Sequence, residues 1–302
     1  MNIKNNDGFK GVFAALVTPM TEQEEIDMDV LRDFTKYQIS EGVHGLIPLG
    51  STGEFYALSP DERSNVLKTT IEVVAGRVPV LAGTNGGSTR EVVSYSQQAE
   101  ELGACGVLLA PPYYSLPTLD ELYEHFRIIN DSIDIPIMLY NYPGRTGVDM
   151  TPDFVERLIE LENIKYIKES TGDITRISEL IQRCGNHLQV FCGCDTIALE
   201  SFLLGAVGWV GGIVNVLPRS HVKLYDLAVI QQDITAAREL YYEILPALRL
   251  IEGGGKYTQL VKAGCGIMDH PVGHPKGPLM PVNEQELQKL KIILDPCKKY
   301  ES

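Results

Sequence analysis

The sequence predicts a (β/α)8 TIM barrel followed by a C-terminal helical extension. Short apolar runs alternate with amphipathic helical segments up to about residue 218, eight such units can be counted, and only helical patterns follow. Parallel strands require a crossover, usually a helix, between them, so this alternation is typical of a parallel sheet. Eight units in roughly 210 residues fit a closed barrel. A doubly wound sheet is less favoured, because no Gly-x-Gly-x-x-Gly follows the first strand.

The strands are expected at short runs rich in β-branched residues. We predict them at residues 12–18, 45–49, 79–82, 106–110, 136–140, 164–168, 188–191 and 207–210. These runs are almost continuously apolar, which is typical of strands that are buried on both faces.

The barrel helices are expected where apolar residues recur at three- and four-residue spacing. We predict them at residues 29–40, 60–74, 89–102, 118–130, 151–161 and 174–183. Several begin with good caps, such as Ser59 before Pro60 and Thr151 before Pro152.

After Pro218 we predict four consecutive helices, at residues 219–230, 235–251 (with a kink at Pro246), 257–268 and 284–293. The first completes the eighth barrel unit. We therefore expect a barrel over residues 1–230. The extension over residues 231–302 should pack on the barrel and not form an independent domain.

Composition excludes some partners. The chain has 40 acidic and 26 basic side chains among 302 residues, a net charge of −14, which argues against nucleic acid or an anionic membrane as a partner. Apolar runs such as residues 207–216 are too short and glycine-rich to span a bilayer. Residues 1–8 lack the apolar core of a signal peptide, and the six cysteines are irregularly spaced. We expect a cytoplasmic protein with reduced thiols.

In such barrels the active site lies at the C-terminal ends of the strands. The predicted ends carry hydroxyls, phenols, a lysine and an arginine: Ser51, Thr52, Tyr113, Tyr114, Tyr140, Arg145 and Lys168. This is an unusual collection for packing alone, and it places the candidate site on one rim.

Lys168 is the strongest candidate for a catalytic residue. Strand alternation puts it on the same face as Tyr166 and opposite Lys165, although the pattern does not say which face is inward. If Lys168 points inward, low-dielectric surroundings disfavour its charged form, and the neutral amine can form a Schiff base with a ketone. The alternative is a solvated lysine that ends a strand.

The neighbouring candidates each have a second interpretation. Tyr140 can relay protons or be a packing aromatic. Ser51 and Thr52 can bind a carboxylate or simply form a turn. Arg145 can grip a carboxylate with two hydrogen bonds or make a surface ion pair.

The sequence gives little support for a metal site. Pro271 and Gly273 prevent the helix that would align His270 with His274, and Cys192 and Cys194 lack a partner pair. We expect no metal and no cofactor, with a keto acid bound covalently through Lys168.

Four motifs at these strand ends resemble the dihydrodipicolinate synthase / N-acetylneuraminate lyase family of pyruvate-dependent class I aldolases. The similarity runs from about Gly11 to Pro218. The motifs are Gly-Ser-Thr-Gly-Glu at 50–54, Pro-Tyr-Tyr at 112–114, Leu-Tyr-Asn-Tyr-Pro-Gly-Arg-Thr-Gly at 139–147 and Ile-Lys-Glu-Ser-Thr-Gly at 167–172. They occur in the order in which the family has them.

The resemblance implies a role for each matching residue. Lys168 would form the Schiff base, Tyr140 would act as acid and base, and Ser51 and Thr52 would relay protons and hold the pyruvate carboxylate. Two further positions match backbone contacts to the bound keto acid, Gly193 and Val210.

Two residues point to the synthase branch of the family. Tyr114 matches a tyrosine that enters the proton relay from a neighbouring subunit, and Arg145 matches the arginine that binds the carboxylate of the aldehyde. The implied reaction condenses pyruvate with aspartate semialdehyde in a homodimer or homotetramer. Three alternatives stay open. The first is an aldolase or dehydratase that acts on 2-keto-3-deoxy sugar acids or N-acetylneuraminate. The others are a keto-acid-binding protein without catalytic activity and a metal-dependent aldolase.

Overall fold

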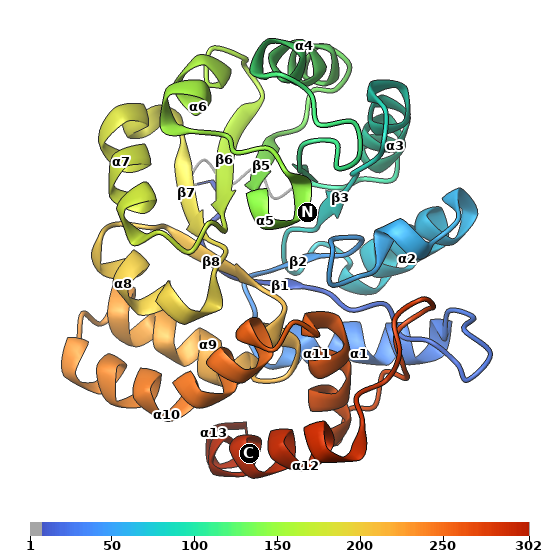
Figure 1. Cartoon of the computed structure of the whole chain (residues 1–302), viewed down its shortest axis with the longest axis vertical. Coiled ribbons are helices and arrows are strands. Elements are labelled where there is room, and N and C mark those ends of the chain that lie inside the picture. The colour runs from blue at the N-terminus through green and yellow to red at the C-terminus, as the bar shows by residue number, and fades with distance from the viewer. Residues whose placement is uncertain (1–7, 302) are drawn as a thin grey trace.

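A computed structural model describes residues 8–301 of the chain, and its centre is a ring of eight parallel strands (Figure 1). The strands are β1 (Gly11–Ala15), β2 (Gly45–Ile47), β3 (Leu81–Gly83), β4 (Gly106–Leu109), β5 (Ile137–Asn141), β6 (Ile164–Glu169), β7 (Gln189–Cys192) and β8 (Gly208–Gly211). Their order is β2-β1-β8-β7-β6-β5-β4-β3. Leu46 forms a parallel bridge with Val80, which joins β2 to the start of β3 and closes the ring. The predicted TIM barrel is confirmed.

Helices surround the strands, as predicted. They are α1 (Met28–Ser40), α2 (Pro60–Val74), α3 (Thr89–Glu101), α4 (Leu119–Asn130), α6 (Pro152–Leu158) and α7 (Ile174–Cys184). The caps come from the expected residues: the Ser59 hydroxyl accepts a hydrogen bond from the Glu62 N–H, and the Glu62 carboxylate accepts one from the Ser59 N–H.

Two short helices were not predicted, α5 (Pro143–Thr146) and α8 (Ala198–Leu203). Neither has a side chain that caps its N-terminus. Segments this short show too few turns for a helical period to be recognised.

The extension follows α9 (Pro218–Tyr225) and a π-helical segment (Asp226–Ile230). It consists of α10 (Ile234–Gly253), α11 (Tyr257–Ile267), α12 (Glu284–Leu294) and α13 (Lys298–Glu301), which gather on one side of the barrel (Figure 1). Pro246 lies inside α10 and does not end it. Ile244 and Leu248 of α10 belong to the same apolar cluster as Val12 and Leu16 of the barrel. Barrel and extension therefore share one core.

The barrel lumen contains a second apolar cluster, and its members show which side chains of each strand point inward. Its buried members are Phe13, Ala15, Ile47, Leu81, Leu108, Met138, Tyr140, Tyr166, Phe191 and Val210. Tyr166 points into the lumen, and because side chains alternate along a strand, Lys168 points inward as well. Lys165, on the opposite face, is exposed. The question that the sequence left open is thus decided for Lys168.

All six cysteines carry free thiols. Between residues 8 and 301, none of the helices combines the length and hydrophobicity that crossing a bilayer would require. Residues 1–7, which bear on the expected absence of a signal peptide, lie outside the described residues.

Candidate active site

Lys168 lies at the mouth of the barrel lumen, against Tyr140. Its side chain is only 6% exposed, and its Nζ lies 4.2 Å from the centre of the Tyr140 ring. The two residues are register partners on β6 and β5. The strand pairing therefore sets the amine beside the phenol, as the sequence predicted.

Gly193, directly after β7, makes room for the lysine. A Cβ at position 193 would lie 2.7 Å from Lys168 Cγ and 2.9 Å from its Cε. Real Cβ atoms do not approach this closely, so a larger residue would displace the amine. Gly193 thus has a steric role in addition to the backbone contact implied by the resemblance.

The Lys168 side chain lines a small inner chamber at the C-terminal ends of the strands. The lining residues are Ser51, Thr52, Tyr140, Tyr142, Arg145, Lys168, Ser170, Gly193, Glu252 and Tyr257. An outer chamber of about 460 Å³ shares four of them, Ser51, Tyr140, Tyr142 and Arg145. The two chambers therefore adjoin each other at these four residues.

The loop that carries Ser51 and Thr52 is held by hydrogen bonds at its C-terminal end, at Gly53 and Glu54. The Thr18 hydroxyl donates a hydrogen bond to the Gly53 carbonyl oxygen at 2.7 Å. Glu54 has a left-handed backbone (φ 58°), and its carboxylate accepts a hydrogen bond from the Lys276 N–H at 2.7 Å.

A buried ion pair joins this loop to the extension. The Nζ of Lys262 on α11 lies 2.5 Å from the Glu54 carboxylate, and the two side chains are 1% and 0% exposed. A second hydrogen bond runs from Lys262 Nζ to the His274 carbonyl oxygen at 2.9 Å. Charges buried this deeply need a partner, so the ion pair holds the loop that carries Ser51 and Thr52 against the extension.

Arg145, on α5, lines both chambers. Its guanidinium lies 5.6 Å from the centre of the Tyr142 ring. No acidic group of residues 8–301 forms an ion pair with it. The surface ion pair that the sequence left open is therefore not formed within the described chain. The guanidinium remains available to an anion in the chamber.

Two predicted residues do not line either chamber. Tyr114 is 93% exposed, whereas its neighbour Tyr113 lines the outer chamber. Val210 is fully buried in the lumen cluster. The proton-relay role of Tyr114 from a neighbouring subunit and the backbone contact of Val210 stay predictions.

Sequence reasoning missed four residues of the inner chamber, Tyr142, Ser170, Glu252 and Tyr257. Ser170 comes directly after β6, two positions beyond Lys168, and among residues 8–301 its buried hydroxyl has no hydrogen-bond partner. Period-two alternation from Lys168 could have identified it. Glu252 near the end of α10 and Tyr257 at the start of α11 carry no motif, because their approach depends on how the extension folds back.

Glu252 and Tyr257 belong to a buried network around Asp195. The Tyr257 hydroxyl donates a hydrogen bond to Asp195 Oδ2 at 2.6 Å, and Trp209 Nε1 donates one to Asp195 Oδ1 at 2.9 Å. Tyr257 Oη in turn accepts one from the Gly212 N–H at 2.9 Å. Burial and the nearby Glu252 carboxylate raise the pKa of Asp195 to about 7.

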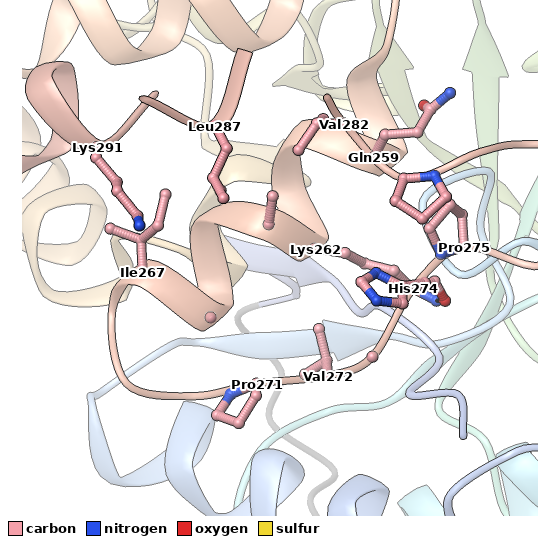
Figure 2. A pocket seen from close by; sticks show the side chains of 14 residues that line it. Gln259, Lys262, Ile267, Pro271, Val272, His274, Pro275, Val282, Leu287 and Lys291 are labelled. Carbon is pink, nitrogen blue, oxygen red and sulfur yellow. Dashed lines mark hydrogen bonds between the residues drawn. The ribbon is translucent and has the colours of Figure 1, made fainter. Parts of the chain in front are cut away.

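A separate cavity of about 450 Å³ lies within the extension and shares no residue with the two chambers (Figure 2). His274 and Lys262 lie close together in it, with Lys291 farther along (Figure 2). The His270 ring is elsewhere, stacked on Tyr37 with the ring centres 3.5 Å apart. Residues 8–301 contain no group of three or more His, Cys, Asp or Glu side chains arranged to hold a metal ion.

The family follows from comparison with known proteins. A model of the dihydrodipicolinate synthetase family matches residues 8–296. The chain belongs to this family. A 4-hydroxy-tetrahydrodipicolinate synthase from Geobacter metallireducens is 39% identical over 297 residues, which cover 97% of this chain and 99% of the relative. Another, from Pelobacter propionicus, is 44% identical over 237 residues, which cover 78% and 81%.

A solved structure agrees. The dihydrodipicolinate synthase from Acinetobacter baumannii, complexed with pyruvate, superposes with a TM-score of 0.91 at 34% identity. The match covers 96% of this chain and 99% of that one. The family resemblance and the barrel expected from the sequence are both confirmed.

Proposed function

We propose that this family member is a 4-hydroxy-tetrahydrodipicolinate synthase, which condenses pyruvate with aspartate semialdehyde through a Schiff base on Lys168. The observation that carries the proposal is the buried Lys168 amine against Tyr140, in a chamber that also presents Arg145 without an ion-pair partner among residues 8–301. The names of the relatives support the synthase over a sugar-acid aldolase.

The residues support a covalent route. The free-base Nζ of Lys168 attacks C2 of pyruvate, and the carbinolamine loses water to give an iminium. Loss of a C3 proton turns the iminium into an enamine, whose carbon attacks the aldehyde carbon. In this proposal the Tyr140 phenol, whose ring centre lies 4.2 Å from Lys168 Nζ, gives and takes these protons.

The hydroxyls of the inner chamber suit the pyruvate carboxylate. Ser51, Thr52 and Ser170 line the chamber around Lys168, and each hydroxyl can donate one hydrogen bond. Bound pyruvate would give the Ser170 hydroxyl a partner. The proposed mechanism binds the keto acid through Lys168 and these hydroxyls, and it uses no metal or other cofactor.

The exposed Tyr114 supports an oligomer. A phenol that is 93% exposed in one chain is available to a second copy, which agrees with its expected role across a subunit boundary. We therefore propose a homodimer or homotetramer, whose oligomeric state can be measured by analytical ultracentrifugation. We also propose a cytoplasmic location, in keeping with the six free thiols.

The proposed function is tested with a panel of aldehydes. Purified protein is incubated with pyruvate and either carboxylated or uncharged aldehydes, and kcat/KM is compared between wild type and Arg145→Ala. Hydrogen bonds to charged groups contribute about 1.5–3 kcal/mol, so the variant should lose roughly 10- to 100-fold with aspartate semialdehyde. Its rates with uncharged aldehydes should stay unchanged.

Arg238→Ala is the matched control, because Arg238 is an exposed arginine on α10 that lines neither chamber. It should leave every rate unchanged. A wild type that prefers uncharged aldehydes would contradict the synthase. It would favour the aldolase for 2-keto-3-deoxy sugar acids or N-acetylneuraminate.

A further inference from the structure

We propose that Glu252 determines substrate specificity by receiving the ammonium group of the aldehyde substrate while Arg145 receives its carboxylate. The inference rests on the proposed function, because the relevant substrate is an amino-acid semialdehyde. It assigns a second charged contact in the same chamber, and this contact comes from the extension and not from the barrel.

Glu252 is fixed in the inner chamber by the backbone. Its Oε1 accepts a hydrogen bond from the Asp195 N–H at 3.0 Å, and its Oε2 accepts one from the Thr196 N–H at 2.9 Å. The two backbone amides hold the carboxylate in one orientation, and each of its oxygens keeps a further lone pair for a ligand. The side chain is half-buried and lines the chamber together with Lys168 and Arg145. The site is thus pre-organised for a cation.

The position of Glu252 in α10 is not explained by the stability of the helix. It is the second-last residue of the helix, where the macrodipole disfavours a negative side chain. The last turn of α10 contains no basic residue to offset that charge. The carboxylate instead accepts hydrogen bonds from the first residues of the 3-10 helix Asp195–Ile197, and it also faces the chamber.

The other charges of the chamber define what Glu252 can bind. Glu252 is the one acidic residue among those that line the inner chamber, which also contains Lys168 and Arg145. Asp195 lies behind it, 1% exposed, with both carboxylate oxygens occupied by Trp209 and Tyr257.

Once pyruvate occupies Lys168 covalently, the protein's remaining charged side chains in the chamber are one guanidinium and one carboxylate, Arg145 and Glu252. This pair is complementary to a molecule that carries both a carboxylate and an ammonium group. A chamber with hydrogen-bonding and charged groups for both ends should discriminate strongly against an analogue that lacks one of them.

The test compares two aldehydes that differ only in the amino group. The KM and kcat/KM for aspartate semialdehyde and the inhibition constant of succinate semialdehyde are measured for wild type, Glu252→Gln and Glu252→Asp. We expect Glu252→Gln to lower kcat/KM for aspartate semialdehyde roughly 10- to 100-fold, the effect of losing a charged hydrogen bond. Its inhibition constant for succinate semialdehyde should change by less than about threefold, and Glu252→Asp should recover part of the loss.

Glu239→Gln provides the control, because Glu239 is exposed on the same helix and lines neither chamber. Borohydride trapping of pyruvate on each variant measures the first step separately. Should Glu252→Gln fail to fold, Glu252→Asp carries the same comparison of the two aldehydes.

Two results would overturn the inference while leaving the synthase intact. Equal weakening of both aldehydes by Glu252→Gln would show a purely structural role. Slower trapping of pyruvate would show that Glu252 is instead the counterion of the iminium on Lys168. If the wild type traps pyruvate but does not use aspartate semialdehyde, the proposed function fails, and this inference fails with it.

Discussion

The barrel and the extension both line the inner chamber, but they contribute side chains of opposite charge to it. The barrel supplies Lys168 and Arg145, which are cationic or nucleophilic, and positions Lys168 through the pairing of β5 with β6. The extension supplies Glu252 and Tyr257, held by backbone amides and by Asp195. The covalent step thus depends on strand geometry, whereas charge balance and loop position depend on how the extension packs.

The two regions also differ in how they hold their parts. Strand hydrogen bonds fix a side chain by register and alternation. The extension holds the Ser51–Thr52 loop at Glu54, through the buried ion pair with Lys262 and a hydrogen bond from the Lys276 N–H. Substitutions in the barrel rim should therefore reduce activity without loss of stability, and substitutions in the extension should reduce both.

Tyr140→Phe separates chemistry from stability in the barrel. Removal of a general acid and base should lower kcat by roughly 10²- to 10⁴-fold. The melting temperature should change little, because the ring remains in the lumen cluster. Steady-state kinetics and thermal unfolding check both parts, with Tyr242→Phe as the control, because Tyr242 is exposed and lines neither chamber. A kcat within threefold of wild type would contradict the assigned role.

Lys262→Met tests the contact between the extension and the loop. It leaves the Glu54 carboxylate buried without its ion-pair partner, which should cost about 3–5 kcal/mol of unfolding free energy. Displacement of Ser51 and Thr52 should also raise KM for pyruvate. Denaturant titration and kinetics measure the two effects.

Two further variants sharpen this test. Glu54→Gln combined with Lys262→Met should recover part of the stability, because it removes the uncompensated charge. Lys276→Met removes the half-exposed Lys276–Glu62 pair and should cost less than about 1 kcal/mol. Equal losses for Lys262→Met and Lys276→Met would show that burial of the Glu54 pair has no special importance.

Asp195 gives a smaller, pH-dependent effect. Burial and Glu252 raise its pKa from 3.8 to about 7 in the folded protein. Between these values the folded chain binds a proton that the unfolded chain has released. The stability that Asp195 contributes is therefore present at low pH and is lost as the pH rises through about 7.

Asp195→Asn should remove this dependence. Unfolding free energies measured between about pH 5 and about pH 8 should fall more steeply for wild type than for the variant, by up to one proton per molecule. Glu239→Gln should retain the wild-type slope. Parallel curves for wild type and Asp195→Asn would contradict the raised pKa.

The barrel half of the site could be predicted because one geometric rule covers it. Strand ends of a parallel barrel converge, so Lys168, Tyr140, Ser51 and Arg145 could be brought together from their places along the chain. Whether the Lys168 side chain points into the lumen could not be predicted, since strands buried on both faces show no alternation of polar and apolar residues. Tyr166 in the lumen cluster decided it.

The extension half could not be predicted for a different reason. Helical periodicity located α10 and α11 but does not specify how the segment between them passes the barrel mouth, so Glu252 and Tyr257 were missed. Tyr114 was found by its motif, but its role depends on a second chain. The short α5 and α8 have too few turns to give a period.

The most direct test of the account is borohydride reduction of the protein in the presence of pyruvate, followed by peptide mass spectrometry. The account predicts that one reduced pyruvate is attached to the peptide that contains Lys168, and that Lys168→Arg abolishes the labelling. Labelling at another lysine such as Lys165, or turnover of pyruvate with no labelling at all, would contradict it.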